Sequence, residues 1–232
     1  MMTFWEHLNE LRIRILYIIL SIIFFSLISL QFIDQIYYFL LKPIDEFSDQ
    51  IKVQVLGVPT IFYIQLILAS FGGIILSIPT IIFNVIKFII PAINNSKKHF
   101  IMYFISIFIM MFLGMFFSYF VVVPFSLDFF ISMKPEFADV ELNFTLSRYL
   151  KFIVWMILSF GISFQLPAVI FLSSQYGLIN YNTLIKNRKY VIMVLLILGA
   201  LITPPDPVSL LMLFFPMYLL FECSILVVYF FR

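Results

Sequence analysis

Charged residues are scarce in this chain, and so are glycine, histidine and cysteine. Of its 232 residues, 11% are charged and 63% are hydrophobic, and the mean hydropathy is +1.12. A soluble domain has about 25% charged residues, so this chain has too little polar surface to cover a globule of its size. The composition excludes a soluble enzyme and a disordered protein, and it leaves an integral membrane protein.

The scarce residue types also exclude several kinds of site. A single cysteine, Cys223, excludes an internal disulfide and any multi-cysteine metal site. The two histidines, His7 and His99, lie at the ends of apolar runs, so they cannot hold a haem between two spans. A net charge of +2 with scattered bases makes no patch for nucleic acid. Without a recognisable catalytic motif, the sequence predicts no enzyme, catalytic residue, cofactor, metal site or nucleic-acid partner.

Long apolar runs favour helices over a β-barrel, whose strands alternate apolar and polar residues in runs of about ten. Six segments are expected to span the membrane: 13–33, 61–90, 100–131, 152–173, 191–202 and 207–231. The first is too long for the core of a cleavable signal peptide, so we expect it to remain as a span. The expected fold is a single all-α, six-span membrane domain over residues 1–232.

The basic residues predict the orientation of these spans. With six spans both termini share a side, and nine of the 14 Lys and Arg residues lie on it. They are Arg12, Arg14, Lys87, Lys97, Lys98, Lys186, Arg188, Lys189 and Arg232. This excess places both termini on the inner side of the membrane.

Span length and proline predict the shape of the bundle. Segment 191–202 is too short to cross a hydrocarbon core about 30 Å thick, and Glu222 interrupts the last segment. We therefore expect the last two spans to be short, with a recessed turn at Asp206 between them. Prolines in or beside the spans favour a kinked and cupped bundle. They are Pro79, Pro91, Pro124, Pro167 and Pro216.

Small residues recur every four positions in the second span, at Ala69, Gly73 and Ser77. Such a row lets two helices approach closely. Packing within the chain is favoured over a contact between copies.

Three polar residues stand in or beside the last spans. An intramembrane carboxylate at Glu222 is either functional or marks a span boundary, and the sequence leaves both open. Gln165 precedes Pro167, so its amide is expected to repair the backbone at the kink. Asp206 is expected to cap the helix that begins at Pro207.

An amphipathic segment leads into the first span. Glu6 and Glu10 share a helical face, and Glu10 faces Arg14 one turn later. The segment anchors the span at the membrane surface, and an exposed acidic pair is also suited to receive a basic peptide.

Several motifs occur in a fixed order along the chain. They are H-L-N-E-L-R-I-R from His7 to Arg14, Pro43, F-I-I-P ending at Pro91, F-S-Y-F-V-V-V-P ending at Pro124, N-R-K-Y from Asn187, L-I-T-P-P-D ending at Asp206, and P-M-Y with F-E ending at Glu222. Together they resemble the TatC family, the polytopic receptor subunit of the twin-arginine (Sec-independent) protein translocase. The resemblance covers nearly the whole chain.

This resemblance implies a receptor for twin-arginine signal peptides of folded cargo. The receptor recruits small single-span TatA- or TatB-like subunits, forms a homo-oligomer in the lipid bilayer and depends on the proton-motive force. Signal binding would involve Glu10, with Arg12 orienting the segment, and Glu6, Phe88 and Lys97. Partner or intramembrane roles would fall to Gln165, Glu222, Pro43, Tyr119 and Asp206.

Two positions depart from the family pattern. Lys97 stands where an inner-loop acid is usual, and Gln165 stands where many members have an intramembrane Glu, so recognition would rest mainly on Glu10. A secondary transporter and a structural subunit of a respiratory complex are the alternatives. The high content of Phe and Ile favours a mitochondrial inner membrane over a plastid or bacterial plasma membrane.

Overall fold

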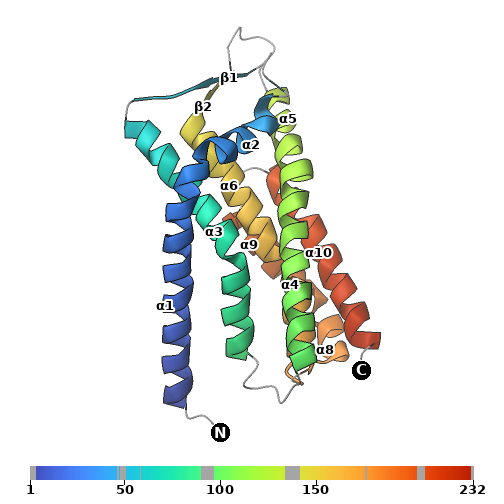
Figure 1. The fold of residues 1–232 in the computed structure, drawn as a ribbon. Coiled ribbons are helices and arrows are strands. Elements are labelled where there is room, and N and C mark those ends of the chain that lie inside the picture. The colour runs from blue at the N-terminus through green and yellow to red at the C-terminus, as the bar shows by residue number, and fades with distance from the viewer. Residues whose placement is uncertain are drawn as a thin grey trace. The chain divides into compact units, whose positions relative to one another are not determined.

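The computed structural model describes residues 4–45, 47, 51–57, 59–89, 97–133, 142–175, 177–202 and 207–230. The described chain is almost entirely helical (Figure 1). In order, its elements are α1 (Phe4–Ser29), the 3₁₀ turn η1 (Leu30–Phe32), α2 (Ile33–Asp45), β1 (Ile51–Gln54), α3 (Pro59–Ile89), α4 (Lys97–Phe117), the π-helical segment η3 (Ser118–Val122), α5 (Val123–Ser132), β2 (Leu142–Thr145), α6 (Leu146–Ser163), α7 (Leu166–Gln175), α8 (Tyr181–Lys186), α9 (Arg188–Ile202) and α10 (Pro207–Phe230). The two short strands pair with each other.

Five stretches of the described chain are long and apolar enough to cross a membrane. They are Trp5–Asp45, Pro59–Phe88, Phe100–Ser132, Leu146–Gln175 and Pro207–Phe230. The remaining predicted span, the fifth in chain order, is α9, whose 15 residues extend only about 22 Å. The all-α membrane fold and the short fifth span are confirmed.

Helix α10 is continuous over 24 residues, about 36 Å, and passes Glu222 without a break, so the helix itself extends beyond the predicted short last span. Arg188 and Tyr218 donate hydrogen bonds to the two carboxylate oxygens of Glu222.

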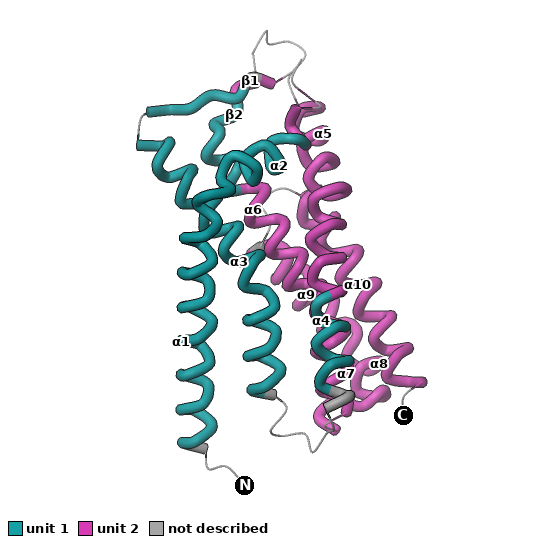
Figure 2. Tube along the Cα trace, in the orientation of Figure 1, with its two compact units in different colours: residues 1–42, 53–108, 144–151 teal, residues 43–52, 109–143, 152–232 magenta. Residues whose placement is uncertain are grey.

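The chain divides into two compact units (Figure 2). One comprises residues 1–42, 53–108 and 144–151, and its main helix contact joins α1 to α3. The other comprises residues 43–52, 109–143 and 152–232, and within it α10 packs against α7, α8 and α9. The prediction of a single membrane domain stays a prediction.

Helices α1 and α3 approach each other closely through small residues (Figure 1). A Cβ atom added to Gly73 would lie 2.7 Å from the backbone of Ser26, and one added to Gly72 would lie 2.8 Å from the side chain of Ile36. The predicted small-residue surface at Gly73 therefore serves packing within the chain, because any larger side chain there would push the helices apart.

Prolines affect the helices in different ways. Pro124 follows the π-helical segment η3, and Pro167 follows an interruption between α6 and α7. Pro79 and Pro216 lie inside helices that continue past them. Proline removes one backbone donor, and a local change of helix type is one way to accommodate that loss. The predicted positions at Pro91 and Asp206 lie outside the described residues.

Candidate functional site

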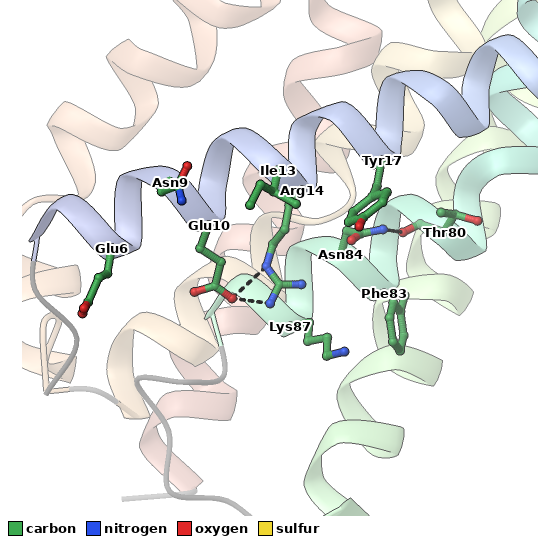
Figure 3. A pocket seen from close by; sticks show the side chains of 10 residues that line it. All are labelled: Glu6, Asn9, Glu10, Ile13, Arg14, Tyr17, Thr80, Phe83, Asn84 and Lys87. Atoms are coloured by element: carbon green, nitrogen blue, oxygen red, sulfur yellow. Dashed lines mark hydrogen bonds and ion pairs between the residues drawn. The ribbon is translucent and has the colours of Figure 1, made fainter.

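A pocket of about 750 Å³ lies between α1 and α3 in the first unit (Figure 3). Its walls are one face of each helix, because the lining positions recur every three or four residues. From α1 come Glu6, Asn9, Glu10, Ile13, Arg14 and Tyr17, and from α3 come Thr80, Phe83, Asn84 and Lys87. The pocket combines carboxylates, basic groups and aromatic rings, so it is suited to a charged peptide rather than to an apolar ligand.

An ion pair between Glu10 and Arg14 lies in this pocket. The Oε1 atom of Glu10 accepts a hydrogen bond of 3.0 Å from Nε of Arg14 and a second one from Nη2. Both side chains are largely buried, at 20% and 15% exposed. The predicted pairing one turn apart is confirmed, and the charge of Glu10 is compensated from its own helix.

The other carboxylate oxygen of Glu10 is differently placed. Oε2 is closed off from solvent and has no hydrogen-bond partner among the described residues. It lies 4.0 Å from Nδ1 of His7, whose ring stacks on Phe88 with centroids 4.3 Å apart. The structure thus brings together Glu10 and Phe88, two of the predicted site residues, with His7 between them.

The sequence analysis did not predict the wall of the pocket that α3 contributes. The buried Asn84 side chain donates a hydrogen bond of 2.9 Å to the carbonyl of Thr80. The ammonium of Lys87 lies 5.1 Å from the ring centroid of Phe83. Thr80, Asn84 and Lys87 stand at i, i+4 and i+7 in the otherwise apolar last part of α3, and this polar face was the signal that could have predicted the wall.

The other predicted signal-binding residues differ in position. Glu6 lines the pocket and is exposed. Arg12 is exposed and is not among the residues that line the pocket. Helix α4 begins at Lys97, but the side chain of that residue is outside the described part of the chain.

A second charged cluster lies within the other unit. Glu222 on α10 accepts a hydrogen bond of 2.8 Å from Nη2 of Arg188 and one of 2.9 Å from the hydroxyl of Tyr218. Helices α8 and α10 also contact each other through the rings of Tyr181 and Tyr229, whose centroids are 5.2 Å apart. Arg188 is the first residue of α9, so this cluster joins the start of one helix to the last third of another. The arrangement favours the interpretation of Glu222 as a boundary residue.

Gln165 lies at the interruption between α6 and α7. Its backbone N–H donates to the carbonyl of Ile162, three residues back, at 3.0 Å. Its side-chain Nε2 donates to the carbonyl of Gly161, four residues back, at 3.3 Å. The side chain thus supplies the donor that regular helix geometry would take from the backbone, which agrees with the expected repair of the kink.

The remaining predicted residues are dispersed. Tyr119 is buried in η3, with its ring 4.9 Å from that of Phe120. Pro43 is buried inside α2. Asp206 lies outside the described residues, so its predicted capping role stays a prediction.

The helical fold, with its long apolar stretches and a charged pocket between α1 and α3, defines a multi-pass membrane protein. The model of one family, Sec-independent protein translocase protein (TatC), matches residues 6–216. The chain belongs to this family, and it is a subunit of the twin-arginine protein translocase. The transporter and the respiratory subunit considered from the sequence are thereby set aside.

Relatives and solved structures agree with this assignment. A TatC protein of Listeria innocua is 35% identical over 227 residues, which are 97% of this chain and 91% of the relative. One from Carboxydothermus hydrogenoformans is 30% identical over 233 residues, 100% of this chain and 94% of the relative. A crystal structure of the twin arginine translocase receptor TatC matches with a TM-score of 0.86 and 28% identity over 96% of this chain and 97% of that one.

These relatives come from bacteria. They give no support to the mitochondrial membrane that the composition favoured. Phe and Ile are abundant in any chain that is mostly membrane-spanning helix, so their abundance does not distinguish one membrane from another. The chain is a multi-pass integral membrane protein.

Proposed function

We propose that the α1–α3 pocket receives the arginine pair of a twin-arginine signal peptide and that Glu10 is its principal acceptor. Supporting this is the Oε2 atom of Glu10, a buried carboxylate oxygen without a hydrogen-bond partner among the described residues. An unsatisfied carboxylate oxygen gains a strong, charge-assisted hydrogen bond when a guanidinium reaches it.

The other walls of the pocket suit an arginine-containing peptide. Glu6 adds a second carboxylate, and Phe83 and Tyr17 offer aromatic faces on which a guanidinium can stack. A lysine ammonium is a point charge and lacks both the planar fork and the stacking. The pocket is therefore expected to prefer an arginine pair to a lysine pair.

We also propose how the rest of the chain participates. Single-span TatA- or TatB-like subunits contact α9 and α10, and copies of the chain associate in the lipid bilayer. The chain acts as a receptor without chemistry of its own, and transport draws on the proton-motive force. The inner ends of α1 and α3 face the compartment from which the cargo comes, in agreement with the distribution of basic residues.

Site-specific photo-crosslinking from Ile13 tests the proposal, because Ile13 lines the pocket and its replacement leaves Glu10 intact. A signal peptide with an arginine pair is compared with the same peptide carrying two lysines. We expect a crosslink that depends on the arginine pair and that falls at least tenfold in Glu10→Gln, since a lost charge-assisted hydrogen bond costs roughly 1.5–3 kcal/mol.

Asp34→Asn is the matched control, because it removes the same charge at the start of α2, away from the pocket lining. An undiminished crosslink in Glu10→Gln, or equal crosslinks with the arginine and lysine peptides, would show that Glu10 is not the acceptor.

A further inference from the structure

We infer that Arg14 occupies the place of an incoming signal arginine, so that the peptide binds by exchanging its guanidinium for that of Arg14 on Glu10. This inference rests on the proposed function and adds the step by which the site opens. It makes Arg14 a residue that sets the affinity of the pocket.

The contacts of Glu10 carry the inference. Its Oε1 atom already accepts two hydrogen bonds from a guanidinium fork, through Nε and Nη2 of Arg14. Its Oε2 atom is closed off from solvent beside the ring of His7. Neither oxygen is open to a ligand in this arrangement, so a peptide arginine reaches the carboxylate only after a group already in the pocket has moved.

The charge of the pocket identifies Arg14 as that group. The charged lining residues are Glu6, Glu10, Arg14 and Lys87, which sum to zero. An arginine pair adds two positive charges, and the group already hydrogen-bonded to the Glu10 carboxylate is Arg14. Removing Arg14 from Glu10 frees one acceptor for the ligand and relieves the repulsion between two guanidinium groups on one carboxylate.

Exchange is feasible because the ion pair is local. Arg14 stands one turn from Glu10 on the same helix, so its long side chain can swing away without any change in the backbone. Tyr17 and Asn84 line the same pocket and offer oxygen atoms to a displaced guanidinium.

Selectivity then comes from Glu10 and not from Arg14. An arginine that replaces Arg14 restores the same forked contact, whereas a lysine gives a single point contact. Because both peptides displace the same resident guanidinium, Arg14 weakens the binding of both by the same factor.

Peptide affinity measured on the full-length chain in detergent tests this inference. Fluorescence anisotropy of a labelled signal peptide gives Kd for the arginine-pair and lysine-pair forms. We expect Arg14→Gln to tighten binding of the arginine peptide on the order of tenfold, as expected for release of one competing charge-assisted contact. Binding of the lysine peptide is expected to tighten by a similar factor, so that the ratio of the two Kd values stays the same, because both peptides displace the same group.

Two further variants complete the experiment. Arg148→Gln is the matched control, because Arg148 is an exposed arginine that does not line the pocket and its loss changes the net charge equally. Arg14→Lys keeps the charge but removes the fork, and we expect an intermediate gain in affinity. If Arg14→Gln does not fold, Arg14→Lys is the variant that tests the inference.

Unchanged or weaker binding in folded Arg14→Gln, or in Arg14→Lys where the first variant does not fold, would overturn the exchange. An equal gain in Arg148→Gln would overturn it as well, since the effect would then come from net charge alone. Failure of the proposed function looks different, because the unmodified chain itself would then bind the arginine and lysine peptides equally.

Discussion

The α1–α3 pair and the α9–α10 pair each hold a carboxylate–guanidinium contact, but the two contacts differ in kind. Glu10 and Arg14 are four residues apart on one helix, and only one carboxylate oxygen is hydrogen-bonded. Glu222 and Arg188 are 34 residues apart on two helices, and both oxygens of Glu222 accept hydrogen bonds. A local pair can break without moving the backbone, whereas a pair between helices holds them together. The first is therefore suited to ligand exchange and the second to stability.

The two helix pairs also differ in how closely their backbones approach, and here the α1–α3 pair is the tighter one. Gly73 places the backbone of α3 directly against α1, where an added Cβ would lie 2.7 Å from Ser26. Gly199 of α9 faces α10 more loosely, and an added Cβ would meet Leu210 at 3.9 Å, an ordinary van der Waals distance. The pocket thus lies in the more tightly fitted helix pair, which holds its two walls in a fixed relation while its side chains move.

The largest effect is expected from Gly73→Ala, which adds one methyl group where there is no room for it. Overpacking of this kind costs about 3 kcal/mol or more, because the two backbones must separate. Thermal unfolding in detergent, followed by circular dichroism, should show a clear fall in Tm. Binding of the arginine peptide should fall with it, because the walls of the pocket move apart.

Gly199→Ala is the control for this prediction. The same change on α9 meets no close neighbour and improves helix propensity, so its Tm should stay the same or rise slightly. Equal losses in the two variants would remove the contrast in packing between the helix pairs.

The next effect is expected from Arg188→Gln, which removes the contact between α9 and α10. Its two side chains are only partly buried, at 44% and 31% exposed, so the loss should be about 1 kcal/mol. Tm should fall by a few degrees while the affinity for the arginine peptide stays unchanged.

Glu10→Gln should behave in the reverse way, with weak binding and a nearly unchanged Tm. A fall in peptide affinity in Arg188→Gln as large as that in Glu10→Gln would mean that the two clusters are not functionally separate.

The sequence alone predicted those features of the helices that depend on regular spacing along one helix. Helical periodicity predicted the pairing of Glu10 with Arg14, and the row of small residues predicted the close packing at Gly73. Hydropathy located the six apolar segments and the short fifth span. Each of these follows from the geometry of a single helix.

Contacts between helices could not be predicted in the same way. The contact of Glu222 with Arg188 was not predicted, because the two residues lie 34 positions apart and no spacing rule connects them. The polar face of α3 is visible in the sequence, but that it lines a pocket with α1 depends on which face of α3 meets α1. Phe88 was expected in the site only through the family resemblance, and its contact with His7 depends on the antiparallel packing of the two helices.

The smallest effect is expected from Lys87→Gln, and it separates direct competition from general charge. Lys87 lines the pocket but contacts the ring of Phe83 rather than a carboxylate, so it repels a peptide arginine without occupying the arginine's place. Its removal should tighten binding only about two- to threefold. The gain should shrink as salt is raised from about 0.05 to 0.5 M, because screening weakens a contact through solvent.

The gain in Arg14→Gln should persist at high salt, since it comes from a buried hydrogen-bonded pair. Lys151→Gln, outside the pocket lining, should show no gain in affinity. A gain in Lys87→Gln as large and as resistant to salt as that in Arg14→Gln would mean that the pocket responds to total charge, and the distinction between an exchangeable pair and its surroundings would then be lost.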